Sequence, residues 1–203
     1  MKKFLSGCLF LCALNLCYSQ SATLDPAFGT RGIVKTDMGT SYNYNGFARQ
    51  VLTQPGGAIY ILLNGNFPGS VISKRLASGA IDSTYGINGY SGSVPVTEAF
   101  AALQPDGKIV IAGVAGNNSF VTERLKSNGT PDSSFGTYGI KVTEFNGASF
   151  ARSVVIQSDG KIVVAGHTAD NSKAYFAVVR YNPNGSNDNS FNGNGKALTD
   201  FMF

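Results

Sequence analysis

The sequence predicts an all-β fold made of a repeated, four-stranded antiparallel unit. Three observations support this prediction: a composition suited to short strands and tight turns, a unit of about 50 residues that recurs three times, and turn signals at the same place in each unit. Of the 203 residues, 25 are glycine and 14% are charged, and the aromatic residues are all Phe or Tyr. After residue 20, apolar residues do not recur at the spacing of a long amphipathic helix.

Residues 1–19 are predicted to form a secretory signal peptide. Met1–Lys3 gives a positive start, Phe4–Leu16 an apolar run, and Cys17–Ser19 small residues near a cleavage point. A lipoprotein cleavage box at Leu5–Cys8 is an alternative, but it leaves almost no apolar run ahead of the cysteine. The run is too short for a membrane span and has no equal elsewhere in the chain, so we expect the mature protein to be secreted or displayed at the cell surface.

Removal of this segment changes the cysteine count and the net charge. Cys8, Cys12 and Cys17 are lost, so neither a disulfide nor a thiolate metal site is expected. Without Lys2 and Lys3 the 16 basic residues become 14 against 12 acids, a net charge of +2 in place of +4. The remaining basic residues are scattered singly, which argues against nucleic acid as a partner.

Residues 20–203 are predicted to form one repeat domain. The same short turn motif begins at Gln54, Gln104 and Gln157, which are 50 and 53 residues apart. Each motif is followed by an apolar run, then by a second run that ends in Arg-Leu or Arg-Tyr, and then by a closing element made of an acid, a turn and an aromatic residue. The expected boundaries are an extra closing element at 24–39, repeat one at 47–96, repeat two at 99–146 and repeat three at 150–203. Ordered features that recur at one period exclude chance similarity.

The signature residues of the second run and the closing element suggest an ion pair inside each unit. They are Arg75, Asp82 and Tyr85 in repeat one, Arg124, Asp132 and Phe135 in repeat two, and Arg180, Asp188 and Phe191 in repeat three. Each arginine precedes its aspartate by seven or eight residues. Anion binding by the arginines is the alternative, but a device that recurs in every unit is typical of folding and less typical of a ligand site.

Hairpin turns are expected between the first two strands of each unit. Their central residues are Gly56 and Gly57, Asp106 and Gly107, and Asp159 and Gly160. We predict two-residue type I′ turns, which need positive φ at both central positions. Four short strands in about 50 residues fit a β-propeller blade better than a β-sandwich, and Lys74, Glu123 and Val179 mark a variable polar position on the third strand.

The run from Gln104 to Gly113, then Arg-Leu, then Asp-x-Ser-Phe-Gly-x-x-Gly, is similar to the delta-60 repeat of secreted bacterial proteins. The resemblance covers residues 24 to 203, with departures at Leu63, Tyr85 and Asn192. It implies a β-propeller, export and surface display, and it supplies no catalytic residues.

Three blades predict a partial or open propeller with an extra N-terminal strand, because closed propellers have about 4 to 8 blades. We therefore expect either a fragment of a longer propeller or an arc that associates with itself through its open blade edges. The closing element at Asp25–Gly29 precedes the first full unit, and so one blade is represented only by its last strand.

No catalytic residue, cofactor or metal site is predicted. His167 is the single histidine, each closing loop offers one carboxylate where calcium needs several, and Glu98, Glu123 and Asp170 are the acids outside the repeated turns. We expect an exported, non-enzymatic module that binds a protein or glycan or serves as a scaffold. The loops 64–70, 116–119 and 167–173 vary between units and are the expected contact surface. A propeller-fold hydrolase or lyase with an axial site is the alternative.

Overall fold

The computed structural model describes residues 23–35, 47–64, 69–116, 118–170 and 173–200. The predicted signal peptide, residues 36–39 of the extra closing element and parts of the three variable loops (65–68, 117 and 171–172) lie outside these residues. Within them the chain forms eleven strands and no helix, as the composition predicts.

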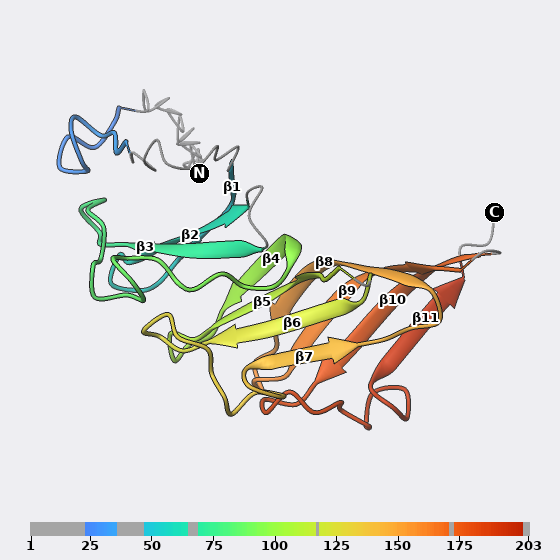
Figure 1. Ribbon diagram of the computed structural model, residues 1–203. Helices are drawn as coiled ribbons and strands as arrows, with labels where there is room; N and C mark the ends of the chain where they lie inside the picture. The colour runs from blue at the N-terminus through green and yellow to red at the C-terminus, as the bar shows by residue number, and fades with distance from the viewer. Residues whose placement is uncertain (1–22, 36–46, 65–68, 117, 171–172, 201–203) are drawn as a thin grey trace, which may run out of the picture.

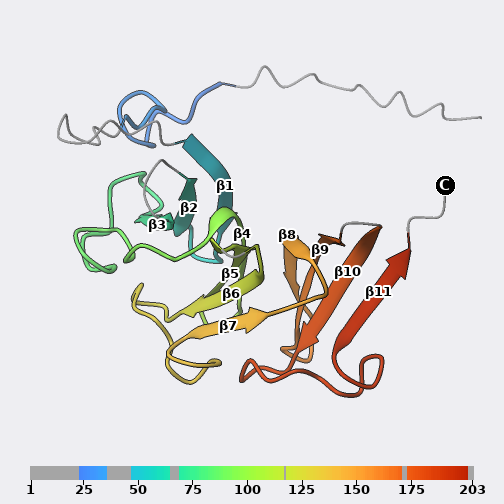
Figure 2. The ribbon, with the colours of Figure 1, turned by 45° about the vertical axis from the view of Figure 1, so that its right-hand side comes forward.

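The strands form three antiparallel sheets that follow one another along the chain (Figures 1 and 2). Each sheet takes its strands in sequence order, so that each repeat folds as a meander. The first sheet contains β1 (Phe47–Thr53), β2 (Ile59–Asn64) and β3 (Ser70–Arg75). The second contains β4 (Thr97–Leu103), β5 (Ile109–Val114), β6 (Phe120–Leu125) and β7 (Ile140–Thr143). The third contains β8 (Ala148–Ile156), β9 (Ile162–Ala169), β10 (Ala174–Tyr181) and β11 (Lys196–Asp200).

Four-stranded blades are confirmed in repeats two and three, whereas repeat one has a three-stranded ladder. Its fourth segment forms no continuous ladder with β3 and meets it through isolated bridges at Tyr90 and Val94 and through a hydrogen bond from the Ser91 amide to the Ile72 carbonyl. Between them, the amide of Ile72 donates to Ser91 Oγ at 2.9 Å. A side-chain hydroxyl thus takes the place of a backbone carbonyl, and the ladder is interrupted there.

The sheets pack face to face as successive blades. The first strand of the middle blade, β4, contacts both β1 and β8, which places the three first strands at the inner edge of the arc. One apolar cluster fills the space between the first two sheets and includes Tyr60, Leu62 and Ile111. A second cluster, with Val110, Phe120 and Val164, fills the space between the last two sheets.

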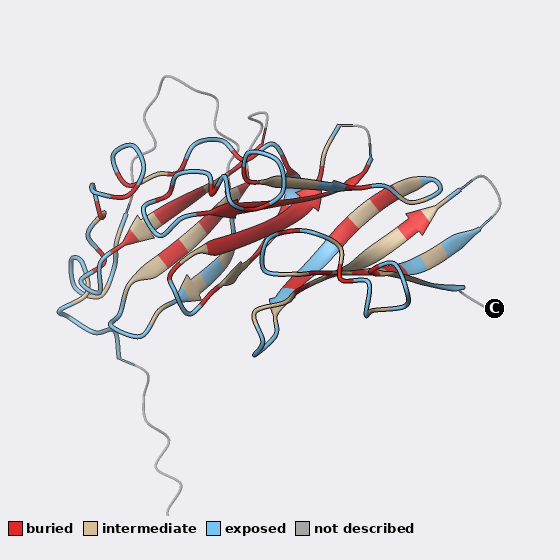
Figure 3. Ribbon diagram, turned by 90° about the horizontal axis from the view of Figure 1, so that it is seen from below, coloured by how far each residue is buried: buried red, intermediate tan, exposed pale blue. Residues whose placement is uncertain are grey.

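The middle blade is covered on both faces, as the bands of buried residues in Figure 3 show. Every residue of β5 and β6 is buried, whereas β1, β10 and β11 alternate or are largely exposed. The described residues therefore form an open arc of three propeller blades, which confirms the predicted all-β, open-propeller fold. The expected extra N-terminal strand does not form among residues 23–35, which contain only an isolated bridge between Thr30 and Ile33.

The predicted type I′ turns are wrong in repeats two and three, whereas Gly56 and Gly57 of repeat one both have the expected positive φ, 99° and 85°. Gly107 and Gly160 have φ near +80°, but Asp106 and Asp159 are not in the positive-φ region. The amide of Gly160 donates to the Gln157 carbonyl at 2.9 Å, which makes a β-turn followed by a left-handed glycine. In this three-residue loop the glycine alone needs positive φ.

Candidate functional site

The closing aspartate of each repeat organises a compact polar loop, which we call the acid loop. In repeat two, Asp132 Oδ1 accepts hydrogen bonds from the Ser134 amide at 3.2 Å and the Ser134 hydroxyl at 2.7 Å. Its other oxygen accepts from Arg124 Nε at 2.9 Å, and Lys108 Nζ lies 3.5 Å away. The Arg124 guanidinium also lies 4.9 Å from the centre of the Phe135 ring.

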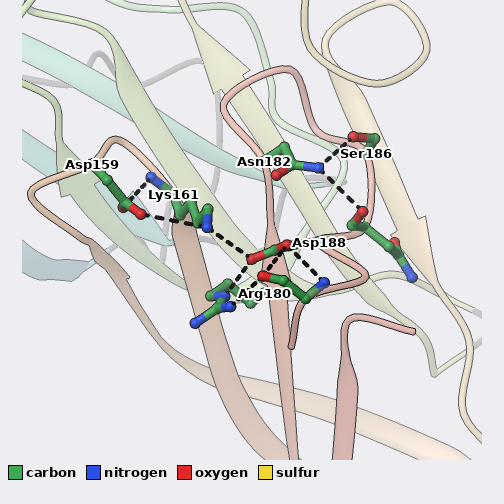
Figure 4. A network of polar contacts seen from close by, with 8 residues as sticks. Asp159, Lys161, Arg180, Asn182, Ser186 and Asp188 are labelled. Carbon is green, nitrogen blue, oxygen red and sulfur yellow. Dashed lines mark hydrogen bonds and ion pairs between the residues drawn. The ribbon is translucent and has the colours of Figure 1, made fainter. Parts of the chain in front are cut away.

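Repeat three builds the same loop (Figure 4). Arg180 Nε donates to Asp188 Oδ2 at 2.7 Å, Lys161 Nζ lies 3.2 Å from the same oxygen, and the Ser190 hydroxyl donates to Oδ1 at 2.7 Å. Arg180 lies 4.9 Å from the centre of the Phe191 ring. Both loops pair an arginine with the aspartate of their own blade.

Repeat one departs from the expected pairing, because Asp82 is paired with Lys74 at 2.9 Å and not with Arg75. The strand register explains this difference. Ile59 stands opposite Arg75, whereas the equivalent Ile109 and Ile162 stand opposite Leu125 and Tyr181. Arg75 therefore lies on the opposite face of its strand from Lys74, since side chains alternate along a strand. Lys74 is the true counterpart of Arg124 and Arg180, and the variable position is occupied by Ser73, Glu123 and Val179.

These contacts hold the aspartates in the ionised form. Burial opposes the charge of Asp132, but hydrogen bonds from Ser134 and the nearby Arg124 and Lys108 cations outweigh it and lower its pKa to about 2. Hydrogen bonds from Thr84 and Lys74 lower the pKa of Asp82. The Asp132 and Arg124 side chains are each 5% exposed, so this pair is enclosed in the fold and is unsuited to receive an anion.

The aromatic residues of the first three closing elements, Phe28, Tyr85 and Phe135, each pack on the following repeat. Carbons of the Phe135 ring lie 3.0 Å from where a Cβ at Gly185 would stand, and the Gly136 amide donates to the Asn184 carbonyl at 3.0 Å. The same pair of contacts joins Tyr85 and Gly86 to the turn at 128–129, and Phe28 and Gly29 to the turn at 78–79. We call the aromatic residue and the one after it the plug, and the receiving turn the socket.

A different polar cluster lies at the inner edge, where β4 meets β8. Arg152 Nη1 of β8 pairs with Glu98 Oε2 of β4, and the two side chains are 41% and 53% exposed. Phe150 stacks on His167 with ring centroids 5.0 Å apart, and Arg152 lies 5.6 Å from the centre of the Phe150 ring. Burial and the Arg152 charge lower the pKa of His167, which favours the neutral imidazole.

The inner-edge cluster recurs only in part in the other blades. Strand pairing places Phe47 and Arg49 of blade one at the positions of Phe150 and Arg152. Asn64 and Val114, however, stand at the position of His167, and Ala48 of blade one stands at that of Glu98. In blade one, Arg49 lies 4.5 Å from the centre of the Phe100 ring of blade two. A polar group that breaks the repetition is the feature expected of a ligand site, because a folding device recurs.

Sequence reasoning noted Glu98 and His167 separately and missed Arg49 and Arg152. A usable signal was present, since both arginines stand five residues before the glutamine that begins the turn motif of their repeat. The pairing of Glu98 with Arg152 joins residues of two blades, and it depends on the bulges in the inner strands.

The remaining acids are placed as follows. Asp170 accepts a turn hydrogen bond from the Lys173 amide at 2.9 Å, and Glu123 is buried within blade two. Among the described residues, no three His, Cys, Asp or Glu side chains are grouped to hold a metal ion. The same part of the chain contains no helix long and apolar enough to cross a membrane.

The repeated blade and its acid loop define a β-propeller repeat protein. Residues 104–135 and 157–191 match a family model described as "Domain of unknown function (DUF5122) beta-propeller". Each matched stretch runs from the turn motif to the closing aromatic residue, in repeats two and three. A search of curated proteins finds no match.

Proposed function

We propose that this protein is an exported, non-enzymatic binding module that recognises a protein or glycan at the inner edge of blades two and three. The observation that carries the proposal is the Glu98–Arg152 pair beside the stacked rings of Phe150 and His167. Between blades one and two, Ala48 and Ala99 occupy the positions of this ion pair. Export rests on the sequence of residues 1–19.

The chemistry of the cluster suits a polar ligand with a flat apolar face. A partly exposed ion pair offers charged hydrogen-bond donors and acceptors, and the stacked rings of Phe150 and His167 offer an apolar plane beside them. A sugar ring or the planar side chain of a protein partner combines these two properties.

The test measures binding of the full chain to a glycan array and to immobilised extracellular proteins. Arg152→Ala removes the guanidinium from the cluster and is expected to weaken binding about tenfold, the scale of a lost charged contact at an interface. Lys126→Ala, which removes an exposed charge on the outer loop of blade two, serves as the matched control. Equal binding by the two variants would exclude this site.

An axial hydrolase or lyase is the second candidate, because the cluster brings a carboxylate, a guanidinium and a neutral imidazole to the inner strands. Mass spectrometry of any glycan that the array identifies separates the two functions. Recovery of the intact glycan supports a binding module, and cleavage that is lost in Glu98→Gln supports an enzyme.

A further inference from the structure

Blade three carries a plug that no socket receives within the described residues. Phe191 and Asn192 occupy the positions of Phe135 and Gly136, and Asn192 has the same left-handed backbone, with φ of 51° against 56° for Gly136. Phe191 lies over Arg180 as Phe135 lies over Arg124. The geometry that docks three earlier elements is thus present a fourth time.

The open face of blade three matches the face of blade two that blade three covers. Val163 and Ala165 of β9 are half-buried, while their counterparts Val110 and Ala112 are fully buried by the next blade. Val155, beside Val163, is 53% exposed. This face has the apolar character of a blade interface.

The arginine of the acid loop also makes a polar contact between neighbouring blades. Arg124 Nη1 donates to the carbonyl of Pro183, which precedes the socket of blade three. Arg180 is bound through Nε and Nη2, as Arg124 is, but its Nη1 has no partner among the described residues. A backbone carbonyl just before another socket could accept a hydrogen bond from Arg180 Nη1, as the Pro183 carbonyl does from Arg124 Nη1.

A matching socket exists at the other end of the same chain. The sockets at 128–129 and 184–185 lie between complete blades, whereas the socket at 78–79 receives only the lone element 23–35. Behind that socket, Ile59, Ile61 and Val71 of blade one are half-buried. Their counterparts in blade two, Ile109, Ile111 and Val121, are at most 2% exposed because blade one covers them.

We infer that blade three docks on blade one of a second copy of this chain, with Phe191 in the partner's socket at 78–79. Two copies joined in this way at both ends form a ring of six blades, which is within the range of about 4 to 8 blades in closed propellers. The interface between the two copies would repeat the contact that neighbouring blades already make inside one chain. This inference is independent of the ligand proposed for the inner edge.

The element 23–35 of each chain occupies the socket at 78–79 and therefore competes with Phe191 of a second copy. Phe28 already packs against Gly79, and the Gly29 amide donates to the Ser78 carbonyl at 2.9 Å. Phe191 of a second copy needs the same socket, so the lone element must leave before the ring closes. The two equivalent phenylalanines therefore have opposite effects on association.

The experiment is sedimentation-velocity centrifugation of the full chain over a series of concentrations. Phe191→Ala removes the incoming plug at both interfaces of the ring and is expected to raise the dimer dissociation constant about a hundredfold, since each truncated aromatic anchor costs roughly tenfold. Phe28→Ala weakens the competitor and is expected to favour the dimer. Tyr138→Ala, which removes a ring that is 84% exposed on the closing element of repeat two, serves as the control and leaves the dimer unchanged.

Circular dichroism identifies variants that fail to fold, and in that case Phe191→Gln and Phe28→Gln replace the alanine variants. A discrete dimer with opposite shifts for the two phenylalanines supports the inference. A monomer at every concentration in both wild type and the Phe28 variant overturns it. Polydisperse association that Tyr138→Ala reduces as much as Phe191→Ala also overturns it, because such association would be non-specific adhesion of apolar surface.

Discussion

Glu123 is a carboxyl group that the fold buries without compensation. It is 4% exposed, it stands between Ile111 and Ile140 on the neighbouring strands, and its Oε2 has no hydrogen-bond partner among the described residues. Burial raises its pKa from 4.5 to about 7. The folded protein therefore binds this proton more tightly than the unfolded chain does.

The contribution of Glu123 to stability should accordingly fall as the pH rises from about 4.5 to about 7, because the folded state must then ionise a buried group. Glu123→Gln removes the ionisation and is expected to raise the free energy of unfolding at about pH 8 by up to roughly 3 kcal/mol, with little change at about pH 4. Urea denaturation of both proteins at the two pH values measures the difference. An equal effect at both values would show that Glu123 does not titrate in this range.

The Arg124–Asp132 pair makes a contrasting prediction for stability. Arg124→Ala leaves a buried aspartate with Lys108 as its remaining cation and with the two hydrogen bonds from Ser134, and we expect a loss of roughly 3 kcal/mol, the lower end for breaking a buried pair. Arg180→Ala should cost less, about 1 kcal/mol, because the Arg180 side chain is 21% exposed. Chemical denaturation compares the two variants, and ligand binding by folded Arg124→Ala should equal that of the wild type.

The sequence predicted the residue types of this loop but misplaced one residue. The spacing of Arg124 and Arg180 to their aspartates is eight residues, and Lys74 has the same spacing to Asp82. Chemical likeness favoured Arg75, but the face of the strand decides which side chain reaches the acid, and a shift of one residue reverses the face. Counting eight residues back from Asp82 would have identified Lys74 as the basic residue that pairs with it.

At the scale of elements, the socket glycines join one blade to the next. A Cβ at Gly185 would stand 2.7 Å from the Gly136 amide nitrogen, and Gly185 has φ of +85°. Gly193 has nearly the same φ, +80°, with no atom within 4 Å of its Cβ position. The two glycines thus have the same left-handed backbone conformation, but only Gly185 is in close contact with the neighbouring blade.

Alanine at either position costs about 1 kcal/mol for the left-handed backbone. Gly185→Ala should cost a further 1 to 3 kcal/mol, approximately, because blade two must move to make room. Thermal unfolding of the two variants isolates the contact between blades. Equal melting temperatures would mean that the socket adapts freely.

Turn positions were predictable from Gly56–Gly57 in repeat one and from Asp-Gly in repeats two and three, whereas the turn type was not predictable in the last two. Gln157, Ser158 and Asp159 lead to a single left-handed glycine, and the Lys161 amide donates to Asp159 Oδ1 at 3.1 Å. The aspartate side chain thus serves the turn while its own backbone stays out of the positive-φ region. Residue preferences for the two turn types overlap at Asp-Gly, so sequence alone does not separate them.

For the whole molecule, burial predicts the order of hydrogen exchange. β5 and β6 lie between two covered faces and should exchange most slowly, by global unfolding, whereas β1 and β11 should exchange through local opening. Exchange followed by mass spectrometry of peptides measures this order. Equal protection across the three blades would indicate that the arc opens only as a unit.

The blade count and strand order followed from the repeat period, because each unit must place the same residues against its neighbours. The inner-edge cluster did not follow, since Glu98 and Arg152 are 54 residues apart and belong to different units. Repetition predicts what is common to the blades, and a site made by their differences appears only when the blades are placed side by side.

Each docked plug meets a socket that comes about 43 to 50 residues later in the chain, and this spacing affects how a gene of this kind can change its number of blades. A duplication with its breakpoints in the short connection from turn to acid, such as Thr130–Pro131, copies one plug together with the socket that receives it. Every junction in the longer product is then matched from the first generation. Recombination at this connection can add or remove whole blades without first damaging the contacts between those that remain.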